Sequence, residues 1–524
     1  MSIDEQKKEA AERGGLLAFQ ASLAPARLAI ESEHGRRSFG ELAENCNRIV
    51  RALRARGIKP GDGVAIFCSN RPEFVEVLHA SLQAGFRFTP VNWHLTPDEA
   101  CYIIDDCEAR AVFIEARFVD VAKEALKNRP DILAYVAIDG VLDGYEDYET
   151  VIVEQDGAPL EDTSRGQVML YTSGTTGRPK GVYRRERPPP SMTEEMTKRS
   201  AAFKPESDLV LVTGPLYHSA PMNLNLTIPL LSGVGVVLMT KWDAEETLRL
   251  VARHGITHTH MVPTMFHRLL QLPEPVRESY DLSTLRWILH GAAPCPAHAK
   301  QAMIEWLGPC LYEYYAGTEG GGTFIYPEEW LKKPGSVGRA TEGTVVRLVD
   351  ENGDEVPQGE TGTIYFKAPA TGRFSYFKAE EKTAESYRGD FFTMGDMGYV
   401  DEDGYYFLTG RSAELIISGG VNIYPQETDS VLLQHPAVAE VCTIGIPNEE
   451  WGEEVKSVVN LNSGYAATEE TAAAILGFAR ANLPTYKCPR SIDFASDALP
   501  RLPTGKILRR QVREPYWEGR AKKI

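Results

Sequence analysis

The chain has 524 residues, of which 43% are hydrophobic and 25% are charged, a composition that supports a packed core and excludes wholesale disorder. At roughly 100–200 residues per domain, this length predicts two to four structural units. The 56 Lys and Arg residues are outnumbered by 73 Asp and Glu residues, giving a net charge of -17. This charge argues against nucleic acid as a partner, because an acidic protein repels polyphosphate backbones.

The first residues and the cysteines indicate an intracellular protein. The opening MSIDEQKKEAAERGG is charged throughout and lacks the apolar core of a signal peptide. The most apolar run, 226–239, is interrupted by Pro229 and is too short to span a bilayer. The eight cysteines include no CxxC pair, which is typical of reduced thiols and not of disulfides or a zinc site. We therefore expect a cytoplasmic protein without a transmembrane segment.

The first half of the sequence predicts an α/β fold. A helix is expected over 39–53, where apolar residues recur at helical spacing after a capping box formed by Ser38 and Glu41. Short apolar runs of strand length then alternate with helical stretches such as the one that begins at Pro72. These runs lie at 63–69, 87–92, 109–115, 210–215, 234–239, 257–263 and 286–292. Buried strands that alternate with helices predict a parallel sheet wrapped by helices.

The pattern changes in the second half. From 335 to 409, short β runs are separated by turn signals such as Asn352-Gly353, which indicates a small antiparallel unit. After Arg411, residues 412–524 read as a compact α+β segment. A basic, proline-rich stretch at 184–190 is interpreted as an extended surface loop.

The strongest functional signal is YTSGTTGRPKG at 171–181. Small and hydroxylated residues in a row make a poor strand or helix interior. Their backbone N–H groups can converge on an anion, however, and Lys180 adds positive charge. The spacing differs from that of a Walker A loop, which requires Gly-Lys-Ser/Thr after a glycine and four residues. Taken alone, a flexible linker explains the segment equally well.

The segment resembles the phosphate loop of the adenylate-forming superfamily, which includes acyl-CoA synthetases, peptide-synthetase adenylation domains and firefly-type luciferases. Further segments resemble the motifs of that family in the same order, with Met394 where Thr is usual. They are Tyr315–Glu319 (YAGTE), Gly395-Asp396, Gly410-Arg411 followed by Gly419–Ile423 (GGVNI), and Pro503–Lys506 (PTGK). The chain is thus identified as a member of this superfamily. The resemblance implies a large N-terminal AMP-binding domain, 1–411, of parallel-sheet α/β subdomains with a β-barrel-like unit near 335–409, and a mobile C-terminal domain, 412–524.

The resemblance also implies a reaction in which a carboxylate and ATP give an acyl-adenylate and pyrophosphate, after which a thiol takes the acyl group. Because the carboxylate is already a nucleophile, the first step needs alignment and charge neutralisation, not a general base. Lys506 is expected to bridge the α-phosphate and the carboxylate, Glu319 to bind Mg²⁺, and Thr318 to contact the α-phosphate. Asp396 is expected to bind ribose and Tyr315 to stack on adenine. The full set implied for ATP is Thr172, Ser173, Gly174, Thr175, Thr176, Gly177, Lys180, Glu313, Tyr315, Asp396 and Arg411.

For the acyl group, the resemblance implies a gate at His218, although a histidine packed in the core is the alternative. The other implied pocket residues are Met222, Asn223, Ala292, Tyr314, Ala316 and Gly317. None of them is Lys or Arg, which favours an apolar or bulky, uncharged acyl body. Ala316 adds a methyl group where Gly is usual and argues against a simple linear-chain pocket. The sequence is most similar to bacterial fatty-acyl or bulky-acid CoA ligases.

The resemblance also implies residues that bind the acceptor of the acyl group. Gly419 and Gly420 should face coenzyme A once the C-terminal domain has turned about a hinge at Ala413, where the family often has Asp or Lys. We expect ATP, Mg²⁺ and coenzyme A as cofactors and a small carboxylic acid as substrate, and leave a homodimer open. An enzyme that passes the acyl group to a carrier protein or an amine is the alternative. A non-catalytic relic is the third reading, and the retention of Lys506, Glu319, Asp396 and Arg411 argues against it.

Overall fold

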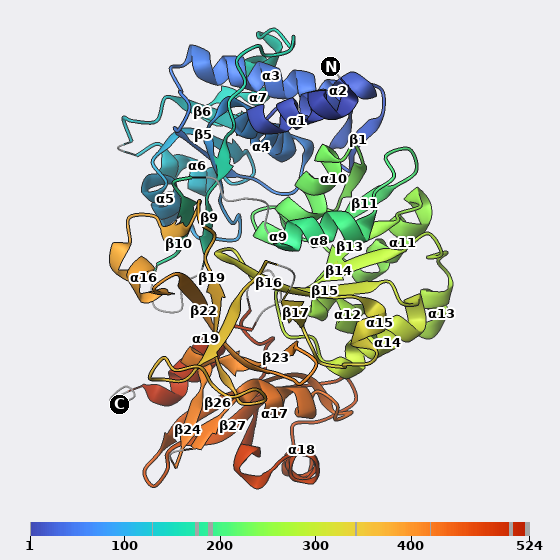
Figure 1. Cartoon of the computed structure of the whole chain (residues 1–524), viewed down its shortest axis with the longest axis vertical. Helices are drawn as coiled ribbons and strands as arrows, with labels where there is room; N and C mark the ends of the chain where they lie inside the picture. Colours follow the sequence, from blue (N-terminus) through green and yellow to red (C-terminus); the bar gives the residue numbers. More distant parts are fainter. Residues whose placement is uncertain are drawn as a thin grey trace.

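The computed structural model describes residues 2–127, 129–172, 178–186, 192–340, 343–419, 421–501 and 507–518. In these ranges no helix is both long enough and apolar enough to cross a membrane. Figure 1 shows the N-terminal elements at one end of the molecule, the C-terminal elements at the other end, and strands of the middle of the chain between them. The mixed α/β fold class expected from the sequence is confirmed, with a large N-terminal sheet region and a small C-terminal one.

A parallel six-stranded sheet organises the N-terminal part, in the order β7-β6-β5-β3-β4-β8. Alternate residues of β3 enter two cores: Val64 and Ile66 pack with α3 and α4, whereas Ala65 and Phe67 pack with α5 and α6. Helices on both faces are typical of a parallel sheet. The strands are β3 (Gly63–Phe67), β4 (Arg87–Pro90), β5 (Ala109–Glu115), β6 (Ala134–Ile138), β7 (Glu146–Asp147) and β8 (Gln167–Val168). The helices are α1 (Ile3–Arg13), α2 (Leu16–Leu23), α3 (Phe39–Ala55), α4 (Pro72–Ala84), α5 (Pro97–Asp106), α6 (Val119–Ala125) and α7 (Tyr148–Val153).

The predicted helix at 39–53 is confirmed as α3. Its capping box is present: the Ser38 side chain accepts a hydrogen bond from the Glu41 backbone, and the Glu41 carboxylate accepts one from the Ser38 backbone. The apolar face of α3 is buried from Phe39 to Leu53. Here a local capping signal and helical periodicity agree, and the sequence alone was sufficient.

A second, fourteen-stranded sheet runs through the described part of the chain. Its main order is β18-β19-β22-β23-β17-β16-β15-β14-β13-β11-β12-β1-β2, with β21 paired to β22. The pairs from β1 and β12 through β15 are parallel, and those from β15 and β16 onward are antiparallel. Most of the antiparallel strands predicted between 335 and 409 therefore continue the large sheet through β17, whereas residues 374–376 pair with another strand in a separate small sheet. This continuity was not visible in the sequence, because it depends on pairing between distant strands.

The strands of the large sheet are β1 (Leu28–Ser32), β2 (Gly35–Ser38), β11 (Leu209–Val212), β12 (Gly235–Leu238), β13 (His258–Met261), β14 (Trp287–His290), β15 (Leu311–Gly317), β16 (Gly320–Ile325), β17 (Gly338–Ala340), β18 (Val346–Val349), β19 (Gly362–Lys367), β21 (Tyr387–Arg388), β22 (Phe391–Val400) and β23 (Tyr405–Arg411). The associated helices are α8 (Met192–Ala201), α9 (Ser219–Met222), the π-helical turn η1 (Asn223–Thr227), α10 (Ile228–Leu231), α11 (Ala244–His254), α12 (Pro263–Leu270), α13 (Glu274–Glu278), α14 (Ala297–Leu307), α15 (Pro327–Trp330) and α16 (Glu380–Glu385).

A small sheet carries the predicted phosphate segment. It contains β9 (Leu170–Thr172), β10 (Lys180–Arg184) and β20 (Phe374–Tyr376), in the order β20-β10-β9. Thr172 and Lys180 are directly paired across the antiparallel strands. The residues between them thus connect two paired strands, with both ends of the connection held by the same sheet.

The C-terminal part forms a five-stranded sheet with its own apolar clusters. The strands are β24 (Ile416–Ser418), β25 (Val421–Ile423), β26 (Val438–Asn448), β27 (Gly452–Leu461) and β28 (Ser491–Phe494). The helices are the 3₁₀ turn η2 (Ser412–Glu414), α17 (Pro425–Leu432), α18 (Glu469–Asn482), the 3₁₀ turn η3 (Thr485–Lys487), α19 (Arg509–Arg513) and the 3₁₀ turn η4 (Glu514–Trp517). The sheet and its helices lie at the C-terminal end of the molecule in Figure 1.

Candidate active site

A cavity of about 1300 Å³ lies where the large sheet, the small β9-β10-β20 sheet and the C-terminal region meet. Residues that follow or end parallel strands line one side of it: Gly214 after β11, Val262 after β13, Ala292 after β14 and Ala316 at the end of β15. Because the carboxyl ends of parallel strands share one edge of a sheet, such residues meet in one crevice, where α/β proteins usually bind ligands.

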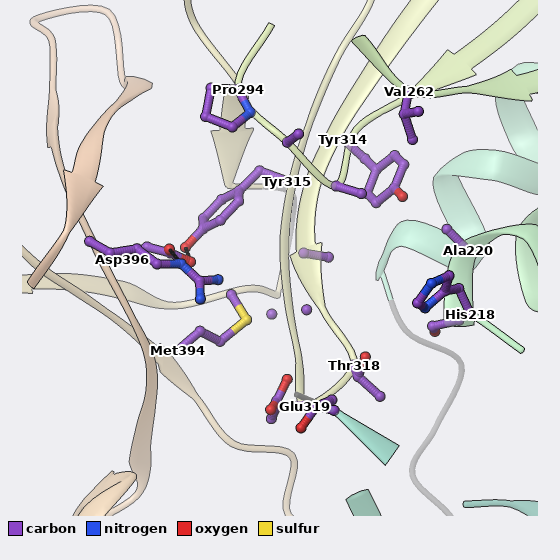
Figure 2. A pocket seen from close by; sticks show the side chains of 18 of the residues that line it. His218, Ala220, Val262, Pro294, Tyr314, Tyr315, Thr318, Glu319, Met394 and Asp396 are labelled. Carbon is purple, nitrogen blue, oxygen red and sulfur yellow. Dashed lines mark hydrogen bonds and ion pairs between the residues drawn. The ribbon is translucent and has the colours of Figure 1, made fainter. Parts of the chain in front are cut away.

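Thr318 and Glu319 form a two-residue turn at the cavity wall. They connect β15 to β16, and the flanking Gly317 and Gly320 are paired with each other. The Tyr376 hydroxyl donates a hydrogen bond of 2.9 Å to the Glu319 carboxylate. Figure 2 shows Thr318 and Glu319 together at one edge of the pocket. The short turn and this bond fix the position of the carboxylate that the sequence assigned to Mg²⁺.

Met394, the departure from the family pattern, packs against this turn. A Cβ atom added to Gly317 would approach the Met394 sulfur to 2.1 Å, so a side chain at 317 would displace Met394. Met394 also lines the cavity and is seen between Asp396 and the Thr318–Glu319 turn in Figure 2. Gly317, predicted as part of the acyl pocket, lines the cavity and leaves space for the Met394 side chain.

Asp396, Arg411 and Tyr315 form a hydrogen-bonded cluster at another edge of the cavity. Asp396 and Arg411 are directly paired on β22 and β23, and Arg411 Nε donates to Asp396 Oδ1 at 2.9 Å. The Tyr315 hydroxyl donates to Asp396 Oδ2 at 2.9 Å. Burial, together with the nearby Asp396 carboxylate, raises the pKa of Tyr315 well above its usual value, so the phenol stays protonated. Each carboxylate oxygen retains a lone pair for a further donor.

Only the ends of the predicted phosphate segment fall within the described residues. Thr172 and Lys180 both line the cavity from opposite strands of the hairpin. Ser173, Gly174, Thr175, Thr176 and Gly177 lie outside the described residues. Arg178, just before β10, stacks its guanidinium over Tyr102 at 4.9 Å, and the Tyr102 hydroxyl bonds to the Pro179 carbonyl. These contacts fix the chain entering β10.

Glu313, predicted to face the adenine amine, lines the cavity and is paired with a lysine that the sequence reasoning did not identify. Lys300, on α14, is fully buried and its Nζ lies 2.7 Å from Glu313 Oε2. The same ammonium lies 4.8 Å from the centre of the Trp330 ring. Burial raises the pKa of Glu313, and the Lys300 charge opposes that rise. A buried lysine 13 residues before an acidic strand residue gives no recognisable sequence pattern.

His218, Asn223, Ala292, Tyr314 and Ala316, all predicted for the acyl pocket, line the cavity. Figure 2 shows His218, Ala220, Val262 and Tyr314 around one part of the pocket, away from Asp396. His218 Nε2 is buried and has no hydrogen-bond partner among the described residues. Burial lowers the pKa of His218 to about 4, so its imidazole is neutral at physiological pH.

Met222 is not among the residues that line the cavity in the described structure. It belongs to the large apolar core cluster of the N-terminal part, whereas its neighbours Pro221 and Asn223 reach the cavity. Asn223 begins the π-helical turn η1 and donates a hydrogen bond of 2.6 Å to Glu194 on α8. Consecutive side chains of a helical turn point in different directions. The motif alone therefore did not indicate which side chains of this segment face the cavity.

The part of the cavity wall that contains His218 includes a strained backbone at Ala292 and is supported by the buried Asn70. Ala292 has a φ of +67°, which is costly for a residue with a Cβ atom and is often seen at functional sites. Asn70, missed by the sequence reasoning, donates to the Gly214 and Met239 carbonyls and accepts from the Leu216 backbone, each at 2.9 Å. Asn70 thus ties the N-terminal sheet to the loop that leads to His218.

The predicted C-terminal residues are distributed differently. Ala413 lies in η2 and lines the cavity, together with Glu427 and Ser430 of α17. Gly419 is not among the lining residues; its N–H donates to the Trp451 carbonyl at 2.8 Å, and a Cβ atom there would lie 2.4 Å from the Trp451 ring. Gly420 and Lys506 lie outside the described residues. In the part of the chain that is described, no group of three or more His, Cys, Asp and Glu side chains could enclose a metal.

The fold is a mixed α/β fold with a cavity at the carboxyl edge of its parallel strands. Residues 17–376 match the model of the AMP-binding enzyme family, and residues 427–506 match that of the AMP-binding enzyme C-terminal domain. Since the first match alone covers more than half of the chain, the protein belongs to the AMP-binding enzyme family, and the predicted superfamily is confirmed.

Three similar proteins illustrate the relationship. An indoleacetate–CoA ligase from Aromatoleum aromaticum is 32% identical over 94% of this chain and 96% of that protein. A fatty acid–[acyl-carrier-protein] ligase from Streptomyces coeruleorubidus is 30% identical over 97% of this chain and 96% of that protein. The solved structure of an anthranilate CoA ligase in complex with anthranoyl-AMP matches with a TM-score of 0.85 and 26% identity, covering 96% and 97% of the two chains.

Proposed function

We propose that the protein is an ATP-dependent, AMP-forming acid–CoA ligase. In the first step a carboxylate oxygen attacks the α-phosphorus of ATP, and an acyl-adenylate and pyrophosphate result. In the second step the thiol of coenzyme A attacks the acyl carbon, AMP leaves and the thiol proton is released. The observation that carries the proposal is that the Asp396–Arg411 pair, the Thr318–Glu319 turn and Lys180 all line one cavity.

The proposed roles follow from the chemistry of the residues. Asp396 accepts hydrogen bonds from the ribose hydroxyls, and Arg411 holds the Asp396 carboxylate in place, as their 2.9 Å bond supports. Thr318 contacts the α-phosphate, and Lys180 with the 172–177 segment holds the β- and γ-phosphates. Charge-assisted bonds of this kind bind phosphates strongly because they neutralise charge in a partly enclosed site.

Glu319 is the residue that we propose for Mg²⁺. A single carboxylate fits this ion, since Mg²⁺ usually retains water and is held by one or two carboxylates together with substrate phosphates. When bound, the ion would neutralise phosphate charge. The Tyr376 hydroxyl, 2.9 Å from Glu319 Oε1, orients the carboxylate for that purpose.

The substrate that we propose is a small, uncharged, apolar or ring-containing acid. The residues proposed to line the acyl side, from Tyr217 to Leu224 together with Ala292 and Tyr314, carry no charged side chain, and the neighbouring Glu313 is paired with Lys300. The names of two similar proteins, an indoleacetate–CoA ligase and an anthranilate CoA ligase, support an aromatic acid. His218, neutral because burial lowers its pKa to about 4, closes this side without adding charge.

Transfer to a carrier protein is the second candidate, favoured by the similarity to a fatty acid–[acyl-carrier-protein] ligase. The test is a panel of aliphatic, aromatic and polycyclic acids with ATP and Mg²⁺, with coenzyme A, with a phosphopantetheinyl carrier protein, or with neither. Pyrophosphate release and product masses are measured. Acyl-CoA formation supports the proposal, and acylation of the carrier alone would replace it with the second candidate.

Lys506 and the C-terminal region offer a further test of the two-step scheme. We propose that residues 412–524 close over the cavity for adenylation and then turn about Ala413, bringing the Gly419-Gly420 segment to the thiol. Lys506→Ala should abolish adenylate formation but still convert supplied acyl-adenylate and coenzyme A to thioester. Ala413→Pro fixes a backbone torsion at the hinge and should spare the first step more than the second. Equal loss of both steps in a folded Lys506→Ala variant would contradict the scheme.

A further inference from the structure

Arg184, the last residue of β10, contacts the Thr318–Glu319 turn. Its Nη2 atom donates hydrogen bonds to the carbonyl oxygens of Thr318, at 3.1 Å, and Glu319, at 2.8 Å. Both protons of one guanidinium nitrogen are therefore used on two consecutive carbonyls. The proline-rich stretch at 184–190 was interpreted as a surface loop, but its first residue belongs to a strand and bonds to the candidate active site.

The contact is local and specific. Successive carbonyls of an extended strand point to opposite sides, so two in a row reach one nitrogen only where the chain turns. The same nitrogen lies 4.0 Å from the Cβ position of Gly320, which shows that Arg184 packs against the turn as well as bonding to it. The guanidinium of arginine is planar and rigid, whereas the ammonium of lysine is a point charge on a flexible stem. A lysine at 184 would therefore keep the two hydrogen bonds to the turn only in part.

Arg184 also connects the turn to the predicted phosphate segment. Lys180 and Arg184 lie at the two ends of β10, with the buried Val182 between them, and alternate residues of a strand share one face. Four residues of strand span about 13 Å. Tyr376, paired with Val182 on the neighbouring β20, donates to the Glu319 carboxylate. One small sheet thus holds both the backbone and the carboxylate of the turn.

We propose that Arg184 is a positioning residue that holds the Thr318–Glu319 turn at a fixed distance from Lys180, so that the metal-binding carboxylate and the phosphate-binding lysine act on the same triphosphate. The positional part of this inference stands on the hydrogen bonds alone. Its consequence for Mg²⁺ and ATP rests on the proposed function. Arg184 has no contact with substrate in this scheme and acts through the turn.

The positional part is tested by hydrogen–deuterium exchange of peptides covering 311–325. Arg184→Met removes both bonds but keeps much of the side-chain volume, Arg184→Lys keeps the charge, and Arg185→Met changes the exposed neighbouring arginine as a matched control. We expect exchange around the turn to rise at least about 10-fold in Arg184→Met, because two hydrogen bonds from a charged donor are lost. Exchange should rise less in Arg184→Lys and stay unchanged in Arg185→Met. Equal exchange in Arg184→Met and Arg185→Met would overturn the proposal.

The consequence for binding of Mg²⁺ and ATP is tested by calorimetric titration of the protein with ATP, with and without Mg²⁺. In the wild type, Mg²⁺ should strengthen ATP binding, and in Arg184→Met this gain should fall about 10- to 100-fold, while metal-free ATP binding changes little. Suppose that exchange shows a loosened turn in Arg184→Met. If Mg²⁺ still strengthens ATP binding by this variant as much as by the wild type, the proposed effect of Arg184 on metal binding is refuted. If wild-type protein does not bind Mg·ATP at all, the proposed function fails, and the exchange experiment still decides whether Arg184 holds the turn. Should Arg184→Met not fold, Arg184→Lys against Arg185→Lys repeats both measurements.

Discussion

The two sides of the cavity are built differently. On the side proposed for the nucleotide, polar groups are bonded to one another: Asp396 to Arg411 and Tyr315, and Glu319 to Tyr376. On the side proposed for the acyl group, the lining residues from Tyr217 to Leu224 are uncharged, and His218 Nε2 has no partner among the described residues. The first arrangement is fixed before any ligand arrives, whereas the second leaves hydrogen-bonding capacity unused.

The difference follows from the elements that carry the residues. The nucleotide side is built on paired β-strands, which hold side chains in register across the sheet. The acyl side is built on the short helix α9, the π-helical turn η1 and the loop at Ala292, which has a strained backbone. In the proposed function, the residues for the adenylation chemistry thus lie on strands, whereas the residues for the acid lie on short helical and loop segments, where the sequence can change without disturbing the sheet.

The largest effect is expected at Glu319. Glu319→Gln replaces a carboxylate by an amide, a poor Mg²⁺ ligand, so adenylation should fall about 100-fold or more. Pyrophosphate release measures the loss, and circular dichroism checks the fold. Glu385→Gln, the same change at an exposed acid that also lines the cavity, is the control. Similar losses in the two variants would mean that the nucleotide side does not depend on the turn.

Asp396 should give the next largest effect. Asp396→Asn weakens the bond to Arg411 and removes the charged acceptor proposed for ribose, so ATP affinity should fall by about 1.5–3 kcal/mol, measured by calorimetry. Asp403→Asn, in the turn at the far end of the same hairpin, provides a matched control. Unchanged ATP binding by Asp396→Asn would remove Asp396 from the nucleotide site.

A smaller, more selective effect is expected at Ala316 on the acyl side. Ala316→Gly removes one methyl group from the wall, which is worth about 1–3 kcal/mol in discrimination between acids. The preference should move toward bulkier acids while the KM for ATP stays constant. Parallel kcat/KM profiles over a panel of acids measure the shift. Identical profiles would mean that Ala316 does not line the acyl pocket. An altered KM for ATP would mean that the two sides of the cavity do not act independently.

The smallest effect concerns the pH dependence of folding stability on the acyl side. His260, on β13, lines the cavity and its Nε2 atom contacts the Tyr314 hydroxyl, and burial lowers its pKa from 6.5 to about 4. As pH falls below about 6.5, the unfolded chain binds this proton before the folded one does. The free energy of unfolding therefore falls by about 1.4 kcal/mol per pH unit between pH about 6.5 and pH about 4. Urea unfolding at pH 7.5 and pH 5 should show a steeper loss for wild type than for His260→Gln. If wild type and His260→Gln lose the same free energy of unfolding between pH 7.5 and pH 5, His260 does not cause the pH dependence.

Much of the architecture could be predicted from local patterns. The capping box before α3, the alternation of strands and helices, and the turn signals of the antiparallel strands all operate within a few residues. The family motifs located Asp396, Arg411, Thr318 and Glu319, which line one cavity in the structure. The fold was predictable because its information lies in short, contiguous segments, whereas the roles of the motif residues stay predictions.

The remaining features depend on contacts between distant parts of the chain. Lys300 beside Glu313, Asn70 beside Leu216 and Arg184 beside Glu319 pair residues that belong to separate elements, and nothing in the spacing of a lone Lys, Asn or Arg indicates its partner. Met222 shows a second limit, because a motif identifies a segment but not which of its side chains turns toward the core. Such details required the three-dimensional arrangement.

The two-residue turn between β15 and β16 has a consequence for how this enzyme can be altered. Thr318 and Glu319 are the whole connection between the paired residues Gly317 and Gly320. One inserted or deleted residue would shift the hairpin register and send every following side chain of β16 to the opposite face. Length variation in a library of variants should therefore be confined to loops around the acyl side, while this hairpin is kept at its natural length.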